Sequence, residues 1–206
     1  MQEKYLNTGW LEMIQDPDEL RRISEEVWKE NIEEKQFTYT GNIHIDFGKL
    51  LSISPEQEPF HTPSVKGIAQ TRHDGMIKNN DIGRYELESD HEIHSVIKQN
   101  FNIEKTQAIL NVQSPGSLCG AHVDKHRPYV TKGTYDFSKT LTKDIYRGIL
   151  FCSDWQVGQV FIVGNECISN WKQGDTFTFP WYMYHGSANA SSKKRHLVQF
   201  MGELTK

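Results

Sequence analysis

The chain has 206 residues and a formal net charge of −4, so its length suits one domain and its charge offers no overall basic surface for a phosphate backbone. No apolar run approaches the roughly 20 residues that span a bilayer. The opening residues, MQEKYLNTGW, lack the basic and then apolar pattern of a secretory signal. These features predict a cytoplasmic protein without a membrane segment.

The cysteines stand at positions 119, 152 and 167, an odd number without the pair spacing of a metal site. We therefore expect reduced thiols in a reducing compartment, each buried as a small hydrophobic side chain.

The N-terminal half contains two segments with helical periodicity. Residues 16–34 and 90–100 carry apolar side chains at helical spacing, and Asp90 is the expected N-cap of the second helix. Between them, residues 66–89 are polar and dotted with glycine, which predicts loops and short strands. The inward-facing positions expected in the second helix are Ile93, Val96 and Ile97.

From about residue 105 the sequence consists of short β-type runs separated by turn residues. No helix of useful length fits between them, which favours an antiparallel jelly roll over a parallel sheet. We predict a mainly β domain over 1–206, in which 1–105 supplies supporting helices, loops and strands and 106–202 forms the core. The expected strands are TQAILNVQ, YRGILFCSDW, GQVFIVG, ECISNW, DTFTFPW and RHLVQF.

Two His-x-Asp triplets occur, His122-Val123-Asp124 and His44-Ile45-Asp46, where about one His-x-acid pair is expected by chance. In a strand, residues i and i+2 point to the same face, so His122 and Asp124 would offer a nitrogen and an oxygen to one point. The natural third donor is His185. Two His and one carboxylate on one face is the arrangement of non-haem Fe(II) oxygenases.

Arg195 follows His185 by ten residues and opens the last predicted strand. A guanidinium fork suits bidentate capture of a carboxylate better than a lysine does. A keto acid chelating the metal, with its far carboxylate on Arg195, would make one coherent site.

At this point the sequence resembles the Fe(II)/2-oxoglutarate-dependent dioxygenases over residues 106–202. The pieces occur in that family's order: a strand and Pro-Gly turn, His-x-Asp, Gly-Asp, the distal His and then the Arg. The resemblance implies a double-stranded β-helix (jelly-roll) core, iron ligands His122, Asp124 and His185, and Arg195 on the C5 carboxylate of 2-oxoglutarate. It also implies that O2 is consumed and that succinate and CO2 are released as a substrate C–H bond is oxidised.

Two subfamilies resemble this sequence locally. His-Gly-Ser-x-Asn at 185–189 is similar to the distal motif of the phytanoyl-CoA hydroxylase group, which implies that Ser187 also binds 2-oxoglutarate. Asn111 precedes His122 by eleven residues, as in the alkylated-nucleobase demethylases, and would contact the same cosubstrate. Gln113 stands where those enzymes have a Tyr. The Trp-x-x-Gly and Trp-x-x-x-His spacings are also similar to superfamily members encoded by large tailed phages.

Other residues have two open interpretations. His44-x-Asp46 lacks the Pro-Gly turn, so we interpret it as a strand with a polar edge. Arg147, like His126 and Arg127, either lies near the iron, touching substrate or the C1 carboxylate of 2-oxoglutarate, or is an exposed polar residue. Residues 125–145 are either a lid or a plain surface excursion. Packing in the core or in turns is the expected role of Trp155, Trp171 and Trp181.

The first functional hypothesis is oxygenation, by default hydroxylation, of a small molecule, an amino acid or a protein side chain. Nucleobase demethylation is the second and would need a positive groove with a stacking aromatic residue. A non-catalytic jelly-roll module that binds a metal or ligand is the third. The direction of Arg195 discriminates, because a structural metal needs no buried carboxylate receptor. Nothing in the sequence indicates the oligomeric state.

Overall fold

The computed structural model describes residues 37–53, 82–122, 145–179 and 183–205. The predicted helix 16–34, Asp124 and the segment 123–144 lie outside these residues. Two helices are described, α3 (Phe47–Leu51) and α5 (Glu92–Phe101). The strands are β1 (Thr38–Asn42), β2 (Ile82–Glu86), β3 (Ile103–Gln113), β4 (Leu118–His122), β5 (Ile145–Phe151), β6 (Gln159–Val163), β7 (Glu166–Ile168), β8 (Asp175–Thr178), β9 (His185–Asn189) and β10 (Arg195–Leu204).

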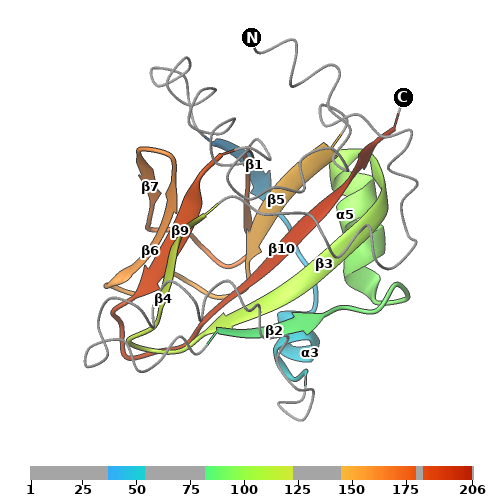
Figure 1. Cartoon of the computed structure of the whole chain (residues 1–206). Helices are drawn as coiled ribbons and strands as arrows, with labels where there is room; N and C mark the ends of the chain where they lie inside the picture. Colours follow the sequence, from blue (N-terminus) through green and yellow to red (C-terminus); the bar gives the residue numbers. More distant parts are fainter. Residues whose placement is uncertain (1–36, 54–81, 123–144, 180–182, 206) are drawn as a thin grey trace, which may run out of the picture.

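The strands form two antiparallel sheets. The six-stranded sheet has the order β1-β8-β5-β10-β3-β2, and the four-stranded sheet has the order β4-β9-β6-β7. From β3 onward the chain passes repeatedly between the two sheets, and β6–β7 is a hairpin within the smaller one. Figure 1 shows the smaller sheet lying to one side of the long strands β3, β5 and β10. The predicted jelly-roll core is confirmed, and β1 and β2 extend its larger sheet at both edges.

The larger sheet separates two hydrophobic clusters, because successive side chains of a strand point to opposite faces. On β10, Val198 and Phe200 pack with the helices, whereas Leu197 packs between the sheets. The strands therefore have apolar residues on both faces, with no simple alternation of apolar and polar residues.

Helix α5 covers the face of the larger sheet that is turned away from the smaller sheet (Figure 1). Its Ile93 and Ile97 are fully buried against Leu110, Val198 and Phe200. Leu50 of α3 joins the same cluster. Helices from the N-terminal half thus buttress one face of the core, as predicted.

The predicted N-cap of α5 is wrong by one residue. The helix begins at Glu92, and His91 is its cap, with Nδ1 accepting a hydrogen bond of 3.1 Å from the backbone N–H of Ile93. Asp90 lies in the preceding turn. Helix α5 ends at Asn102, whose left-handed conformation (φ 51°) is one that asparagine tolerates.

The cluster between the sheets is aromatic. Trp171 stacks on Phe151 with ring centroids 3.9 Å apart, and its Nε1 donates to the carbonyl of Ser153. Trp155 packs against the same cluster and donates to the carbonyl of Gln159. Packing roles for these two tryptophans are confirmed, and Trp181 lies outside the described residues.

The three cysteines all lie in described residues, and none is in a disulfide. Cys119 and Cys152 are buried as predicted, and burial raises the pKa of the Cys152 thiol to about 12. Cys167 is exposed, contrary to prediction, because it lies on β7 at the edge of the smaller sheet with its side chain on the outer face. Within the described residues, no helix is long and apolar enough to cross a membrane.

Candidate functional site

Strand β9 brings two of the predicted site residues into the space between the sheets. His185 is 4% exposed and Ser187 5% exposed, on the same face of the strand. The backbone of His122 on β4 pairs directly with that of His185, so the first residue of the His-x-Asp motif lies beside the distal histidine. Gly186 permits this approach, since a Cβ there would lie 2.9 Å from the carbonyl oxygen of Cys119. Asp124 lies outside the described residues.

The hydrogen bonds of His185 define its tautomer. Nδ1 lies 3.1 Å from the carbonyl oxygen of Met183, which can only accept, so Nδ1 carries the proton and Nε2 presents a lone pair. Nε2 accepts a hydrogen bond of 3.1 Å from Nη2 of Arg147. The rings of Phe179 and Phe161 lie 5.2 and 6.2 Å from the imidazole. A neutral imidazole with a free lone pair aimed into a protein interior is the form that ligates a metal.

Arg147 on β5 is the residue that the sequence analysis left open, and the structure places it inside. It is 2% exposed, and its guanidinium lies 4.9 Å from the centroid of Phe179. The sequence contained a signal for this position, because Arg147 alternates with Ile149 and Phe151, which both face the inter-sheet cluster. The exposed interpretation is therefore wrong.

Arg195 is the second buried guanidinium of the interior, at 3% exposed. Its Nη1 donates to the carbonyl of Val160 at 2.9 Å, and its Nε has no hydrogen-bond partner. Burial lowers the pKa of Arg195 to about 10, which still leaves it protonated at neutral pH. Among the described residues, no carboxylate forms an ion pair with it.

The turn before β10 positions this arginine. Asn189, the last residue of the His-Gly-Ser-x-Asn motif, donates to the carbonyls of Gln113 and Lys193, both at 2.9 Å. Its Oδ1 accepts from the hydroxyl and the N–H of Ser191. These bonds close the turn, so that β10 begins at Arg195, directly opposite Gln113 of β3.

Gln113 fills the polar space between the sheets. Its Nε2 donates to the carbonyl of Ser117 at 3.0 Å and that of Ser187 at 3.4 Å, and its Oε1 accepts from the Ser187 hydroxyl. Asn111 lies on the same face of β3, is buried, and donates a long bond of 3.4 Å to the carbonyl of Ile109. The sequence analysis noted Gln113 as a departure and missed its bridging role, which depends on the partner sheet.

The strand register relates the two ends of the site. Phe161 and Val160 of β6 pair with Ser187 and Ala188, so the Arg195 guanidinium, bonded to Val160, lies near the level of Ser187. His185 lies two residues away along β9, about 6.7 Å at the usual rise of a strand. Extended, the four carbon–carbon bonds of a five-carbon diacid cover roughly 5 Å. The interior can therefore accept a metal at His185 and a distal carboxylate at Arg195.

Within the described residues, no three His, Cys, Asp or Glu side chains are grouped to hold a metal. That set does not include Asp124, and His122 enters the description only through its backbone pairing. The donor chemistry of His185 nevertheless fits a metal ligand. His122 and Asp124 remain predicted ligands.

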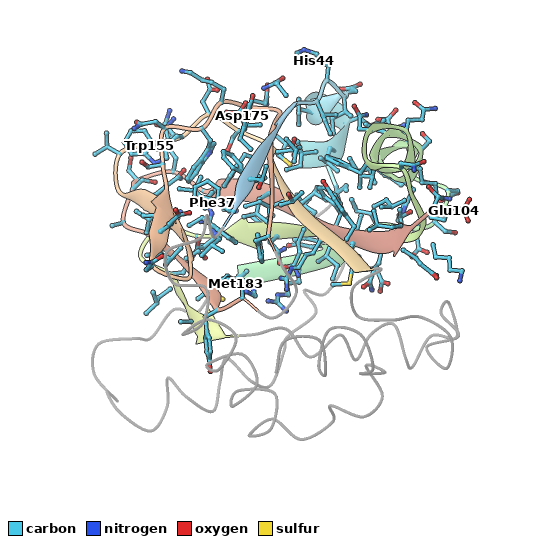
Figure 2. The ribbon with its side chains drawn as sticks, turned by 90° about the horizontal axis from the view of Figure 1, so that it is seen from above. Phe37, His44, Glu104, Trp155, Asp175 and Met183 are labelled. Carbon is cyan, nitrogen blue, oxygen red and sulfur yellow. The ribbon has the colours of Figure 1, made fainter. Side chains whose placement is uncertain are left out.

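The second His-x-Asp copy has a different local structure. His44 is exposed, and Asp46 is the N-cap of α3, its Oδ1 accepting from the backbone N–H of Lys49 at 3.0 Å. The interpretation as a polar-edged strand is wrong, because β1 ends at Asn42 and the segment leads into a helix. His44 projects outward on the opposite side of the ribbon from Met183, which holds the His185 imidazole (Figure 2).

No protein-family model matches the sequence, and no curated protein matches it either. The fold is similar to that of the viral collagen prolyl hydroxylase of Paramecium bursaria Chlorella virus-1, solved as a 2OG complex, with TM-score 0.51 and 13% identity over 84% of this chain and 98% of that one. A cupin 2 conserved barrel domain protein from Salinispora arenicola matches with TM-score 0.36 and 11% identity, over 61% of this chain and 78% of that one. A variant of Bacillus subtilis oxalate decarboxylase matches with TM-score 0.39 and 13% identity, over 73% of this chain and 29% of that one. At these identities the likeness is one of fold, in agreement with the jelly-roll topology.

Proposed function

We propose that this protein is an Fe(II)- and 2-oxoglutarate-dependent oxygenase. His185, with His122 and Asp124, would hold the metal, and Arg195 would hold the C5 carboxylate of 2-oxoglutarate, with Ser187 and Asn111 beside it. The bound metal and cosubstrate would supply the oxidising chemistry. The protein would orient the ligands, exclude bulk water and present the substrate C–H bond.

The buried Arg195 is the observation that carries the proposal. A guanidinium transferred from water to a protein interior is costly unless an anion compensates it. Here the charge is held by one backbone carbonyl and faces no carboxylate among the described residues, two residues along the barrel from His185. A ligand carboxylate would supply the missing counter-charge and would bond the unpartnered Nε.

The non-catalytic alternative predicts an Arg195 that points to solvent, because a structural metal needs no carboxylate receptor. At 3% exposed, Arg195 favours the oxygenase over that alternative. A protein of the same fold, the viral prolyl hydroxylase, has been solved with 2OG, so the fold is compatible with this cosubstrate. Hydroxylation of a small molecule, an amino acid or a protein side chain is the reaction we favour.

The test is a visible spectrum of the anaerobic protein titrated with Fe(II), before and after addition of 2-oxoglutarate. Chelation of Fe(II) by the keto acid produces a weak metal-to-ligand charge-transfer band that neither addition gives alone. We expect this band in the wild-type protein, and its loss in Asp124→Ala and His185→Ala.

The chain supplies its own matched control. His44→Ala alters the second His-x-Asp copy, whose histidine is exposed and remote from the barrel interior, and should leave the band unchanged. Metal binding without any band would favour the structural-metal module. Equal loss of the band in the His44 and His185 variants would show that the assay does not report this site.

A further inference from the structure

The contact between Arg147 and His185 places a cation on the atom that a metal needs. Nε2 of His185 has one in-plane lone pair, because Nδ1 carries the ring proton. Nη2 of Arg147 donates to that lone pair at 3.1 Å. A lone pair that accepts from the guanidinium cannot at the same time ligate a metal, so metal entry requires Arg147 to move.

The guanidinium cannot move far. Arg147 is 2% exposed on β5, with Phe179 4.9 Å from its guanidinium carbon, and returning to water would require its strand to open. Once displaced from Nε2, the positive charge stays within a few ångströms of the metal. Like charges at that separation repel strongly where water is scarce.

An anionic metal ligand would reverse the sign of this interaction. A carboxylate coordinated beside His185 lies within reach of a guanidinium that has just lost its acceptor, and the two groups form strong charge-assisted hydrogen bonds. Arg195 already serves the far end of the site, so Arg147 is available for the carboxylate next to the metal.

We propose that Arg147 couples metal binding to anion binding at this site. The metal ion alone binds weakly, and it binds tightly together with a chelating 2-keto carboxylate, whose carboxylate takes the hydrogen bonds that Arg147 gave to His185. This inference rests on the proposed metal site and adds a residue and an order of assembly to it. By linkage, the metal must strengthen keto-acid binding by the same factor.

The experiment measures the Kd of Co(II) by calorimetry, alone and with saturating 2-oxobutyrate. This keto acid can chelate a metal but has no distal carboxylate, so Arg195 takes no part. The ratio of the two Kd values is the coupling factor. We expect about 100 for the wild-type protein, within the usual range for coupled sites.

Arg147→Gln and Arg147→Met remove the charge while filling similar space. Both should bind Co(II) alone about tenfold more tightly than the wild type, and the coupling factor should fall to about 10 or below. Arg147→Lys keeps the charge and should keep most of the weak binding of Co(II) alone. Arg195→Met is the matched control, a second buried arginine, and should leave the coupling factor with 2-oxobutyrate unchanged.

Three outcomes contradict the inference: neutral Arg147 variants with wild-type coupling, neutral variants that bind Co(II) more weakly, or a wild-type coupling factor near one. The last needs no variant to fold. Failure of the proposed function looks different, because Co(II) would then bind His185→Ala as tightly as the wild type. If binding needs His185 while the Arg147 variants keep full coupling, only the inference fails.

Discussion

Arg195 and Arg147 illustrate how one residue type takes two roles inside one barrel. Arg195 is fixed by a backbone carbonyl and has a nitrogen to spare, which suits a receptor for an incoming carboxylate. Arg147 is already bonded to the proposed metal ligand, which suits a residue that responds when that ligand changes partner. The difference comes from the position along the barrel and the partner sheet.

Replacement of Arg195 by lysine tests the receptor role. Arg195→Lys keeps a positive charge but loses the planar fork and the bond geometry to Val160, so 2-oxoglutarate should bind about 10- to 100-fold more weakly to the Fe(II)-loaded protein. Titration of the charge-transfer band measures this. Because 2-oxobutyrate has no distal carboxylate, its affinity should change little, and an equal loss for both keto acids would contradict the assignment.

At the scale of elements, α5 is a helix whose cap titrates. The Nδ1 of His91 can accept from Ile93 only when the ring is unprotonated there. Burial lowers the pKa of His91 below its ordinary value of 6.5. The unfolded chain therefore takes up a proton at a higher pH than the folded one, and the cap stabilises the fold less as pH falls below about 6.5.

Replacement of His91 by asparagine or aspartate should remove that pH dependence. Both residues are good N-caps, and neither titrates as histidine does between pH 5 and 7. In chelator-treated protein, the free energy of unfolding of the wild type should fall relative to His91→Asn and His91→Asp as pH is lowered from 7 to 5. Burial also lowers the pKa of His196, which adds an acid-side loss common to all three proteins. Denaturant melts at several pH values measure the difference, and parallel curves would exclude His91 as its source.

At the scale of the whole molecule, the site lies between two sheets that meet only when the barrel is closed. The proposed ligands would contact β9 and β10, one strand from each sheet, so bound ligand should oppose unfolding of the entire core. A ligand at a thousand times its Kd adds about 4 kcal/mol of stability.

A melting experiment tests this linkage. Each kcal/mol raises the Tm of a chain of this size by about 2–4 °C. Metal and 2-oxoglutarate together should raise the Tm by several degrees more than the sum of the separate additions, because each strengthens binding of the other. A chelator should reverse the shift, and Asp124→Ala should not show it. Additive or absent shifts would argue against a shared site.

Local patterns determined much of this protein. Strand-forming runs without intervening helices predicted the antiparallel jelly roll, and the order His122, Asp124, His185, Arg195 predicted which residues share a site. The structure confirms the fold and brings His185, Ser187, Asn111 and Arg195 to the space between the sheets. Strand alternation and residue order are properties of the chain itself, so they can be recognised before the chain folds.

Contacts between the sheets were decided only by the tertiary structure. The bond from Arg147 to His185 joins residues 38 positions apart, and Gln113 meets Ser187 across 74 positions. No local pattern specifies such pairs, because they depend on how β5 and β3 face β9 across the barrel. The same reason explains the error at His91, whose capping bond depends on where α5 docks rather than on the acidic residue before it. Composition and order thus named the candidate residues, whereas the packing of one sheet on the other set their partners, their burial and the charge that each one faces.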